Sequence, residues 1–234
     1  MRLVVLDTET TGLEIREGHR VIEIGCVELV NRRHTQNRFH AFINPERSID
    51  VGALEVHGIT EDFLADKPVF TEIIVEFINF ISGAEVIIHN APFDLSFLNS
   101  EFERAREKRR LDELCTVTDS LQLARQLHPG QRNSLDALCR RYDVDNAERT
   151  LHGALLDAEI LADVYLAMTG GQSDISFETP ARHSGQRRVG STRDASGSVV
   201  EVVRASPQEL KEHQRWIELL GEHCVWTQTS NDPD

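Results

Sequence analysis

The most constraining feature of this sequence is an apolar run, Leu3–Leu6, that leads directly into two carboxylates, Asp7 and Glu9. Branched apolar residues bounded by a glycine turn at Gly12 predict a buried β-strand. Because side chains alternate along a strand, Asp7 and Glu9 would share one face and Thr8 would lie on the other. Two acids on one face repel each other, and a hard divalent cation between them would relieve that repulsion. The alternative is a turn entry with two solvated acids.

Further strands and helices follow along the chain. Alternating or continuous apolar residues predict strands at 20–31, 34–43, 85–89 and 115–117. Helical spacing, capping residues and glycine or proline stops predict helices at 50–56, 70–81, 92–108, 119–127, 133–142 and 153–168. The strands come first as a meander and then alternate with helices. This order predicts an α/β domain, a mixed sheet flanked by helices, that ends near residue 170.

Length and composition fit one sizeable core followed by a tail, or two small domains. The chain has 234 residues, of which 40% are hydrophobic. It has no apolar run of about 18 residues and no signal peptide at its start, so we expect a cytoplasmic protein without a membrane span. The four cysteines are scattered and form no CxxC pair, which predicts reduced core residues rather than a zinc site.

The charge of the chain limits how it could bind nucleic acid. There are 25 Lys and Arg residues against 39 Asp and Glu residues, a net charge of −14. This balance argues against a protein that holds nucleic acid in a basic groove. A nucleic-acid substrate would bind weakly, and metal ions or a partner protein would have to supply the attraction.

Three further positions carry candidate chemistry when they are considered together. Asp94 follows a predicted strand, and His152 and Asp157 flank the start of the last predicted domain helix. Singly, they would be a helix N-terminal acid, a loop histidine and a solvated helix acid. With Asp7 and Glu9 they make four carboxylates and a histidine, a set that suits a two-metal hydrolytic centre with Mg²⁺ or Mn²⁺. A histidine that titrates near neutrality can accept a proton from the attacking water.

Three short motifs resemble those of the DEDDh exonucleases in their order and separation. They are DTETTG at 7–12, HNAPFD at 89–94 and HGALLDA at 152–158. The resemblance extends from about Arg2 to Met168, and His152 stands five residues before Asp157, as the family's histidine stands before its last aspartate. Two more segments look like one branch of the family, the proofreading subunits of bacterial replicative DNA polymerases. These segments are VHGIT at 56–60 and NSLDALC at 133–139.

The resemblance implies a ribonuclease-H-like fold and removal of deoxynucleotides from the 3′ end of DNA as nucleoside 5′-monophosphates. It implies that Asp7, Glu9 and Asp157 hold the first of two divalent cations and that Asp7 bridges to the second. Asp94 would complete the metal site, directly or through water. His152 would be the general base.

The resemblance also implies substrate contacts, which Asp7, Glu9 and Asp157 would share. His57 matches a position that meets the terminal nucleotide, although it is also placed as an ordinary histidine at a helix C-terminus. Asn90 would help to position the substrate. Leu13, Val56 and Phe93 would form an apolar seat for the terminal base. Such a seat favours frayed or single-stranded 3′ ends, because unpairing costs least at a mismatch.

A hexapeptide follows the exonuclease domain, which we place at 1–171. Residues 172–177 resemble the short motif that binds the sliding clamp, with Gln172, Ile175 and Phe177 at the matching positions. Asp174 departs from the serine often found there. The alternative is an ordinary junction between a domain and a linker.

Residues 178–198 are rich in Ser, Gly and Arg and predict a flexible linker. Residues 199–234 are too few for an independent core, and we expect them to bind a partner protein. Within them, Ala205–Trp226 resembles the family's segment that attaches to the polymerase catalytic (alpha) subunit. The apolar residues that would fill a groove on that partner are Leu210, Trp216, Leu219, Leu220, Val225 and Trp226. The alternative is a helix that packs back on its own domain. The sequence leaves open whether a small stabilising subunit binds as well.

The motif set favours a proofreading 3′→5′ DNA exonuclease over three alternatives. An RNA-trimming member of the family would share the five site residues but has no evident need of a clamp motif and a polymerase-docking tail. An inert adaptor between clamp and polymerase has no need of repelling carboxylates. A generic metal-dependent phosphoesterase would not require a polynucleotide 3′ end.

Overall fold

The computed structural model describes residues 1–147, 149, 151–170, 191–193, 199–201 and 205–221. The chain divides into two compact units, Met1–Ile175 and Ser176–Asp234. The first contains the predicted α/β domain. Among the residues that are described, no helix is both long enough and apolar enough to cross a membrane.

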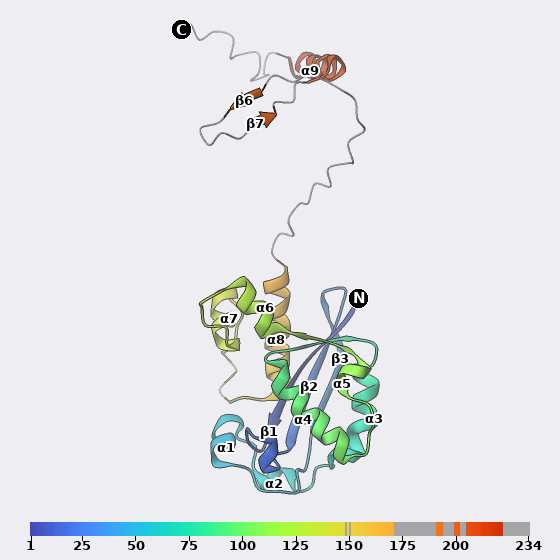
Figure 1. The fold of residues 1–234 in the computed structure, drawn as a ribbon, viewed down its shortest axis with the longest axis vertical. Coiled ribbons are helices and arrows are strands. Elements are labelled where there is room, and N and C mark those ends of the chain that lie inside the picture. The colour runs from blue at the N-terminus through green and yellow to red at the C-terminus, as the bar shows by residue number, and fades with distance from the viewer. Residues whose placement is uncertain (148, 150, 171–190, 194–198, 202–204, 222–234) are drawn as a thin grey trace. The chain divides into compact units, whose positions relative to one another are not determined.

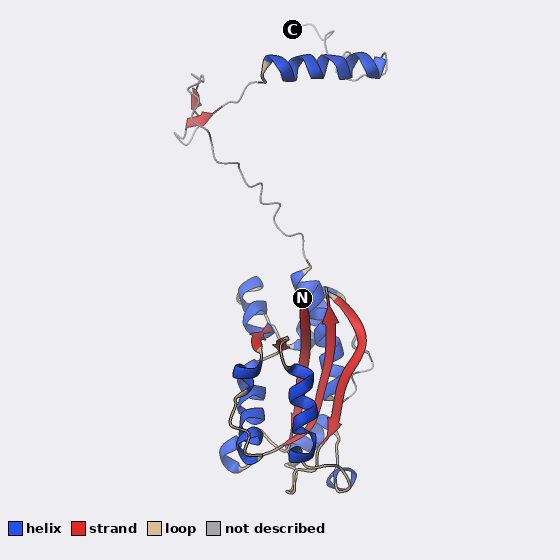
Figure 2. Ribbon diagram, turned by 90° about the vertical axis from the view of Figure 1, so that its right-hand side faces the viewer, coloured by secondary structure: helices blue, strands red, loops and turns tan. Residues whose placement is uncertain are grey.

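A five-stranded mixed sheet organises the first unit, as the sequence predicts. Its strands lie in the order β3-β2-β1-β4-β5, with β2 antiparallel to β1 and β3, and with β1, β4 and β5 parallel. Their bounds are β1 (Arg2–Thr10), β2 (Val21–Val30), β3 (Arg33–Phe42), β4 (Glu85–Ile88) and β5 (Thr116–Asp119). The long strands lie side by side in Figure 2, with helices packed against them.

Two layers of helices cover the two faces of this sheet (Figure 1). One layer consists of α3 (Phe70–Ile81), α4 (Ala91–Arg104) and α5 (Leu111–Leu114). The other consists of α6 (Ser120–Leu127), α7 (Leu135–Tyr142) and α8 (Ala154–Thr169). Three short helices follow β1 or β3 outside these layers, namely η1 (Ile15–Glu17), α1 (Val51–His57) and α2 (Glu61–Leu64).

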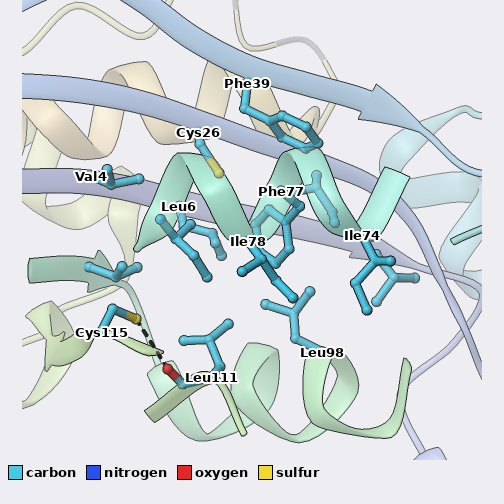
Figure 3. Packing of buried hydrophobic residues seen from close by; sticks show 14 of the residues in the cluster. Val4, Leu6, Cys26, Phe39, Ile74, Phe77, Ile78, Leu98, Leu111 and Cys115 are labelled. Carbon is cyan, nitrogen blue, oxygen red and sulfur yellow. Dashed lines mark hydrogen bonds between the residues drawn. The ribbon is translucent and has the colours of Figure 1, made fainter. Parts of the chain in front are cut away.

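Residues of β1 contribute alternately to two hydrophobic cores. Val4 and Leu6 pack with side chains of α3 and α4, and Figure 3 shows this core around Phe77. Leu3 and Val5 pack on the other face with side chains of α7 and α8. The alternation continues past the end of the apolar run, so the next side chains on the α8 face belong to the two acids of the first motif.

The predicted elements differ from the observed ones mainly at their ends. The helix predicted to run to residue 108 ends at Arg104, because Arg106 adopts a left-handed conformation with φ 60°. The Glu107 amide then donates a hydrogen bond to the Phe102 carbonyl, which closes the helix end. Helices η1 and α5 were not predicted, since each is one turn or less. Three of the cysteines, Cys26, Cys115 and Cys139, are free and buried, as predicted; Cys224 lies outside the described residues.

The described part of the second unit holds two short strands and a helix. The antiparallel strands β6 (Ser191–Arg193) and β7 (Val199–Glu201) pair, so residues 191–193 of the predicted linker form a strand. Helix α9 (Pro207–Leu220) begins with a capping box, in which the Ser206 hydroxyl accepts from the Glu209 amide and the Glu209 carboxylate accepts from the Ser206 amide. The clamp-like segment, residues 172–177, and the rest of the linker lie outside the described residues.

Candidate active site

The two acids of the first motif lie at the end of β1 on the face that α8 covers. Asp157 lies in the first turn of α8 and is 3% exposed. The strand thus brings Asp7 and Glu9 to the same face of the sheet as Asp157. The sequence predicted a shared face for the first two acids; the packing of α8 adds the third.

Asp94 reaches the same place from the opposite helix layer. It lies in the first turn of α4 and is 3% exposed. The Thr8 side chain lies on the other face of β1 from its neighbours Asp7 and Glu9, and its hydroxyl donates a hydrogen bond of 2.7 Å to Asp94 Oδ1. The end of β1 therefore gathers carboxylates from both layers of helices.

A fifth buried acid, Glu23, anchors the helix that carries Asp157. Glu23 lies opposite Glu9 in the β1–β2 pair and is 3% exposed. Its Oε2 accepts a hydrogen bond of 3.1 Å from the backbone amide of Ala154, which is the first residue of α8. Its Oε1 lies 2.8 Å from His40 Nε2. Sequence reasoning missed this residue. The available signal was a glutamate between apolar residues of a predicted strand.

The carboxylates raise one another's pKa values because they are buried together. Burial raises the pKa of Asp7 well above its usual value, and the charges of Asp94, Glu9 and Asp157 raise it further. Burial raises the pKa of Glu9 to about 8 and that of Asp94 to about 7, the latter despite the hydrogen bond from Thr8. The buried acids thus repel one another more than the neighbouring Arg149 charge compensates, and a divalent cation would relieve that repulsion.

The arrangement of donor atoms fits a metal centre. Glu9, His152 and Asp157 each offer a ligand atom, and these atoms all lie within 4.8 Å of one another. Asp7 and Asp94 line the same cavity, which has a volume of about 270 Å³. The structure thus brings together all five residues that the motifs predicted. Carboxylate oxygens are the ligands that Mg²⁺ and Mn²⁺ prefer.

Arg149 contacts this cluster and was not predicted. Its Nε and Nη2 atoms donate hydrogen bonds of 2.5 and 2.7 Å to the two carboxylate oxygens of Asp157, and its Nη1 donates one of 2.6 Å to Asp136. Burial alone would raise the pKa of Asp157, but hydrogen bonds from Arg149 and His152 outweigh it and lower that pKa. An arginine in a loop before the third motif gives no local signal for this pairing.

His152 lies at the edge of the cluster. Its backbone amide donates a hydrogen bond of 3.1 Å to the Val56 carbonyl, which ties the third motif to α1. Its side chain is 45% exposed, and its Nδ1 lies 3.3 Å from Asp157 Oδ2. The carboxylate of Asp157, as a hydrogen-bond acceptor, is the main cause that raises the pKa of His152.

A second, larger cavity adjoins the first. It has a volume of about 580 Å³ and shares Thr8, Glu9 and Phe93 with the carboxylate cavity. The predicted apolar seat lies here, because Leu13 and Val56 also line this cavity, and both side chains are exposed. Asn90 lines the carboxylate cavity instead, at the N-terminus of α4 with φ 73°.

His57 also lines the larger cavity, and its surroundings define its tautomer. Its Nδ1 accepts a hydrogen bond of 3.0 Å from the Ile59 amide, so the neutral ring carries its hydrogen on Nε2. The Nε2 atom is buried and makes no hydrogen bond within the part of the chain that the structure describes. Burial lowers the pKa of His57. The ring is therefore a neutral donor beside the carboxylates.

Comparison with known proteins agrees with this geometry. Residues 4–165 match the family described as exonuclease. DNA polymerase III subunit epsilon of Haemophilus influenzae is 47% identical over an alignment of 241 residues. The alignment covers 96% of this chain and 94% of that protein. The subunit of the same name from Escherichia coli K12 is 48% identical over 235 residues, which span 96% of this chain and 97% of that protein.

A solved structure has the same fold. It is exonuclease X in complex with 5′ overhanging duplex DNA, with a TM-score of 0.55 and 27% identity, and the match covers 72% of this chain and 91% of that one. The fold, the motif residues in one cavity and the long sequence matches point the same way. The chain belongs to the exonuclease family, among the relatives named DNA polymerase III subunit epsilon.

Proposed function

We propose that this chain is a proofreading 3′→5′ DNA exonuclease that serves a replicative DNA polymerase. One observation carries the proposal: the four carboxylates of the motifs and His152 line one cavity, and an apolar cavity large enough for a nucleotide base adjoins it. Family membership supports exonuclease chemistry, and the near full-length relatives are polymerase subunits.

The residues of the carboxylate cavity divide the chemistry between them. Asp7, Glu9 and Asp157 would hold a first divalent cation, and Asp7 with Asp94 a second. Two bound Mg²⁺ or Mn²⁺ ions would supply the positive charge that lowers the pKa of water and neutralises the scissile phosphate. His152 would accept the proton of the attacking water through the ring nitrogen that is free of hydrogen.

The apolar cavity supports selection of unpaired ends. Leu13, Val56 and Phe93 would contact the terminal base, and stacking of a base on an aromatic ring such as that of Phe93 contributes about 1–3 kcal/mol. The His57 Nε2–H group would donate a hydrogen bond to an acceptor on the terminal nucleotide. Asn90 would help to position the substrate. A mispaired end enters more readily, because less pairing energy is lost.

The tail would bring the acidic domain to its substrate. In α9, Trp216, Leu219 and Leu220 follow helical i, i+3, i+4 spacing and are 65%, 69% and 58% exposed. This apolar stripe would dock on the polymerase alpha subunit, and residues 172–177 would bind the sliding clamp. The sequence predicts a linker before this tail. In general, a flexible chain of about 20 residues reaches roughly 25 Å, and a tether of that kind raises the local concentration to the order of millimolar. Tethering would offset the weak binding that the net charge of −14 implies.

The test is time-resolved digestion of a DNA primer with a mispaired 3′ end and of a fully paired primer, with Mg²⁺. We expect stepwise loss from the 3′ end, faster at the mismatch, and a reduction of at least about 100-fold in His152→Ala. Preference for a matched RNA oligonucleotide would favour RNA trimming instead. Absence of turnover with both Mg²⁺ and Mn²⁺ would favour the adaptor.

A further inference from the structure

His19 is a buried histidine that the proposed chemistry leaves unused. It lies just before β2, is 3% exposed, and lines the larger cavity together with Leu13 and Val56 of the apolar seat. These two seat residues come from separate segments, since Leu13 lies in the loop after the first motif strand (residues 11–14, the motif loop) and Val56 lies in α1. The width of the seat therefore depends on how firmly α1 is held against the motif loop.

One nitrogen of the His19 ring contacts the motif loop. Nδ1 lies 3.0 Å from Thr11 Oγ1, and this hydroxyl oxygen accepts a hydrogen bond of 3.0 Å from the Arg20 amide. The hydroxyl hydrogen is thus available for donation to Nδ1, and the neutral ring carries its own hydrogen on Nε2. Gly12 makes room for the ring, because a Cβ atom at that position would overlap His19 Cε1.

The other ring nitrogen contacts the start of α1. Nε2 lies 3.3 Å from Oδ2 of Asp50, the N-cap residue of α1, and 3.5 Å from Oε2 of Glu17 in η1. An N-cap aspartate commonly accepts a hydrogen bond from an amide of the first helical turn, but the Asp50 side chain makes no such bond. Its carboxylate lies against His19 instead. The Asp50 amide also donates a hydrogen bond of 2.9 Å to the Thr11 carbonyl, so backbone and side chain join the same two segments.

Helix α1 carries the effect of this contact to the seat. It is 7 residues long, from Val51 to His57, and its last turn holds Val56. The Val56 carbonyl in turn accepts a hydrogen bond of 3.1 Å from the His152 amide. Because so short a helix moves as one body, loosening its N-terminal end would shift Val56 relative to Leu13.

We propose that His19 is a positioning residue that clamps α1 to the motif loop and so sets the width of the seat for the terminal base. Its ring bridges Thr11 and Asp50, which are 39 positions apart but are joined through one buried side chain. The clamp is a property of the folded chain, and only its effect on DNA rests on the proposed function.

The first measurement is amide hydrogen exchange of the full chain without DNA, followed over residues 50–58. In His19→Ala we expect these amides to exchange faster on the order of tenfold, because a hydrogen bond to a charged group is lost at the start of the helix. His19→Gln places an amide near the Nε2 position and should keep most of the protection. His19→Asn places one near Nδ1, which does not reach Asp50, and should lose it.

Two further variants separate the clamp from general loss of charge. Asp50→Ala removes the carboxylate on α1 and should accelerate exchange as His19→Ala does, and Asp50 makes no capping bond whose loss would confuse the result. Glu17→Ala is the matched control, since it removes the other carboxylate near Nε2, which lies on η1 rather than on α1. Exchange over residues 50–58 should match the wild type in that variant.

The second measurement is steady-state digestion of a short single-stranded DNA with Mg²⁺. His19→Ala should raise KM on the order of tenfold and leave kcat unchanged, because the seat is loosened while the carboxylates and His152 stay in place. His19→Gln should restore KM toward the wild-type value. A fall in kcat with an unchanged KM would contradict a role in the seat.

The exchange data can overturn the clamp by themselves. Unchanged exchange over residues 50–58 in His19→Ala would do so, and so would equal acceleration in Asp50→Ala and Glu17→Ala. If His19→Ala does not fold, the pair His19→Gln and His19→Asn decides, since greater protection in the asparagine variant contradicts the contact with Asp50. Accelerated exchange in a chain that digests no DNA would support the clamp and count against the proposed function.

Discussion

Gly25 lies directly opposite Asp7 in the antiparallel pair of β1 and β2, and the first turn of α8 occupies the space beside it. A Cβ atom at position 25 would overlap the Leu155 nitrogen and the Ala154 carbonyl group. The missing side chain therefore allows α8 to approach the sheet closely enough for Asp157 to join the acids of β1.

Substitution Gly25→Ala should separate the acids. The added methyl group must push the start of α8 away from β2, and overpacking of this kind costs about 1–3 kcal/mol. Small displacements of catalytic groups reduce rates on the order of 100-fold. We expect a lower melting temperature and a slower rate at saturating Mg²⁺. Gly52→Ala is the stability control, because the methyl group added there would lie in open space. Wild-type activity in Gly25→Ala would contradict the close-approach argument.

Substitution Thr8→Val should weaken metal binding. The Thr8 hydroxyl stabilises ionised Asp94, and hydrogen bonds to charged groups contribute about 1.5–3 kcal/mol. Without it, the pKa of Asp94 rises beyond about 7, and fewer molecules carry the ionised ligand at neutral pH. We expect the half-saturating Mg²⁺ concentration for exonuclease activity to rise on the order of tenfold. Thr8→Ser keeps the hydroxyl and should resemble the wild type; an equal loss in both variants would point to packing instead.

The stability of the chain should depend on pH in the direction set by its buried carboxyl groups, of which Glu9 is one. The pKa of Glu9 rises from 4.5 to about 8 on folding, chiefly through burial, so the folded chain binds this proton more tightly than the unfolded chain. The free energy of unfolding should therefore fall as the pH rises from about 5 to about 8 in a chelator. Urea unfolding across this range measures the slope.

Two comparisons check the assignment of that slope. Glu9→Gln removes one of the titrating groups and should make the slope shallower, while the raised pKa values of Asp7 and Asp94 keep its sign. Added Mg²⁺ should restore stability most at the high-pH end, where the carboxylates are ionised. Asp157 does not offset the trend, since its pKa is lowered and its contribution is already complete above its usual value of 3.8. A rising free energy of unfolding between pH 5 and 8 would contradict the prediction.

The two nitrogens of His57 should differ in importance. Asparagine places a polar atom near the Nδ1 position, which accepts from Ile59, whereas glutamine places one near Nε2. If Nε2–H contacts the terminal nucleotide, His57→Asn should lower kcat/KM about tenfold and His57→Gln should lose less, since a buried donor to substrate contributes about 1 kcal/mol. Steady-state digestion of a short single-stranded DNA measures both. The reverse order would assign the role to loop structure rather than substrate contact.

The sequence determined the local geometry of this protein. The period of two in the first strand put Asp7 and Glu9 on one face, and the predicted helices placed Asp94 and Asp157 in first turns. Motif order then identified the five residues that the structure collects in one cavity. These features could be read because each depends on residues that are close together in the chain.

Only the tertiary structure decided how those residues are held. Glu23 bonds to Ala154 across 131 positions, and Thr8 bonds to Asp94 across 86. The period of a strand or helix says nothing about which distant partner will lie opposite. Arg149 lies only 8 positions from Asp157, yet their pairing depends on how a loop folds over the start of α8, and no local pattern encodes it. The sequence therefore supplied the reacting groups, while long-range packing set their distances, their pKa values and the hydrogen bonds that control them.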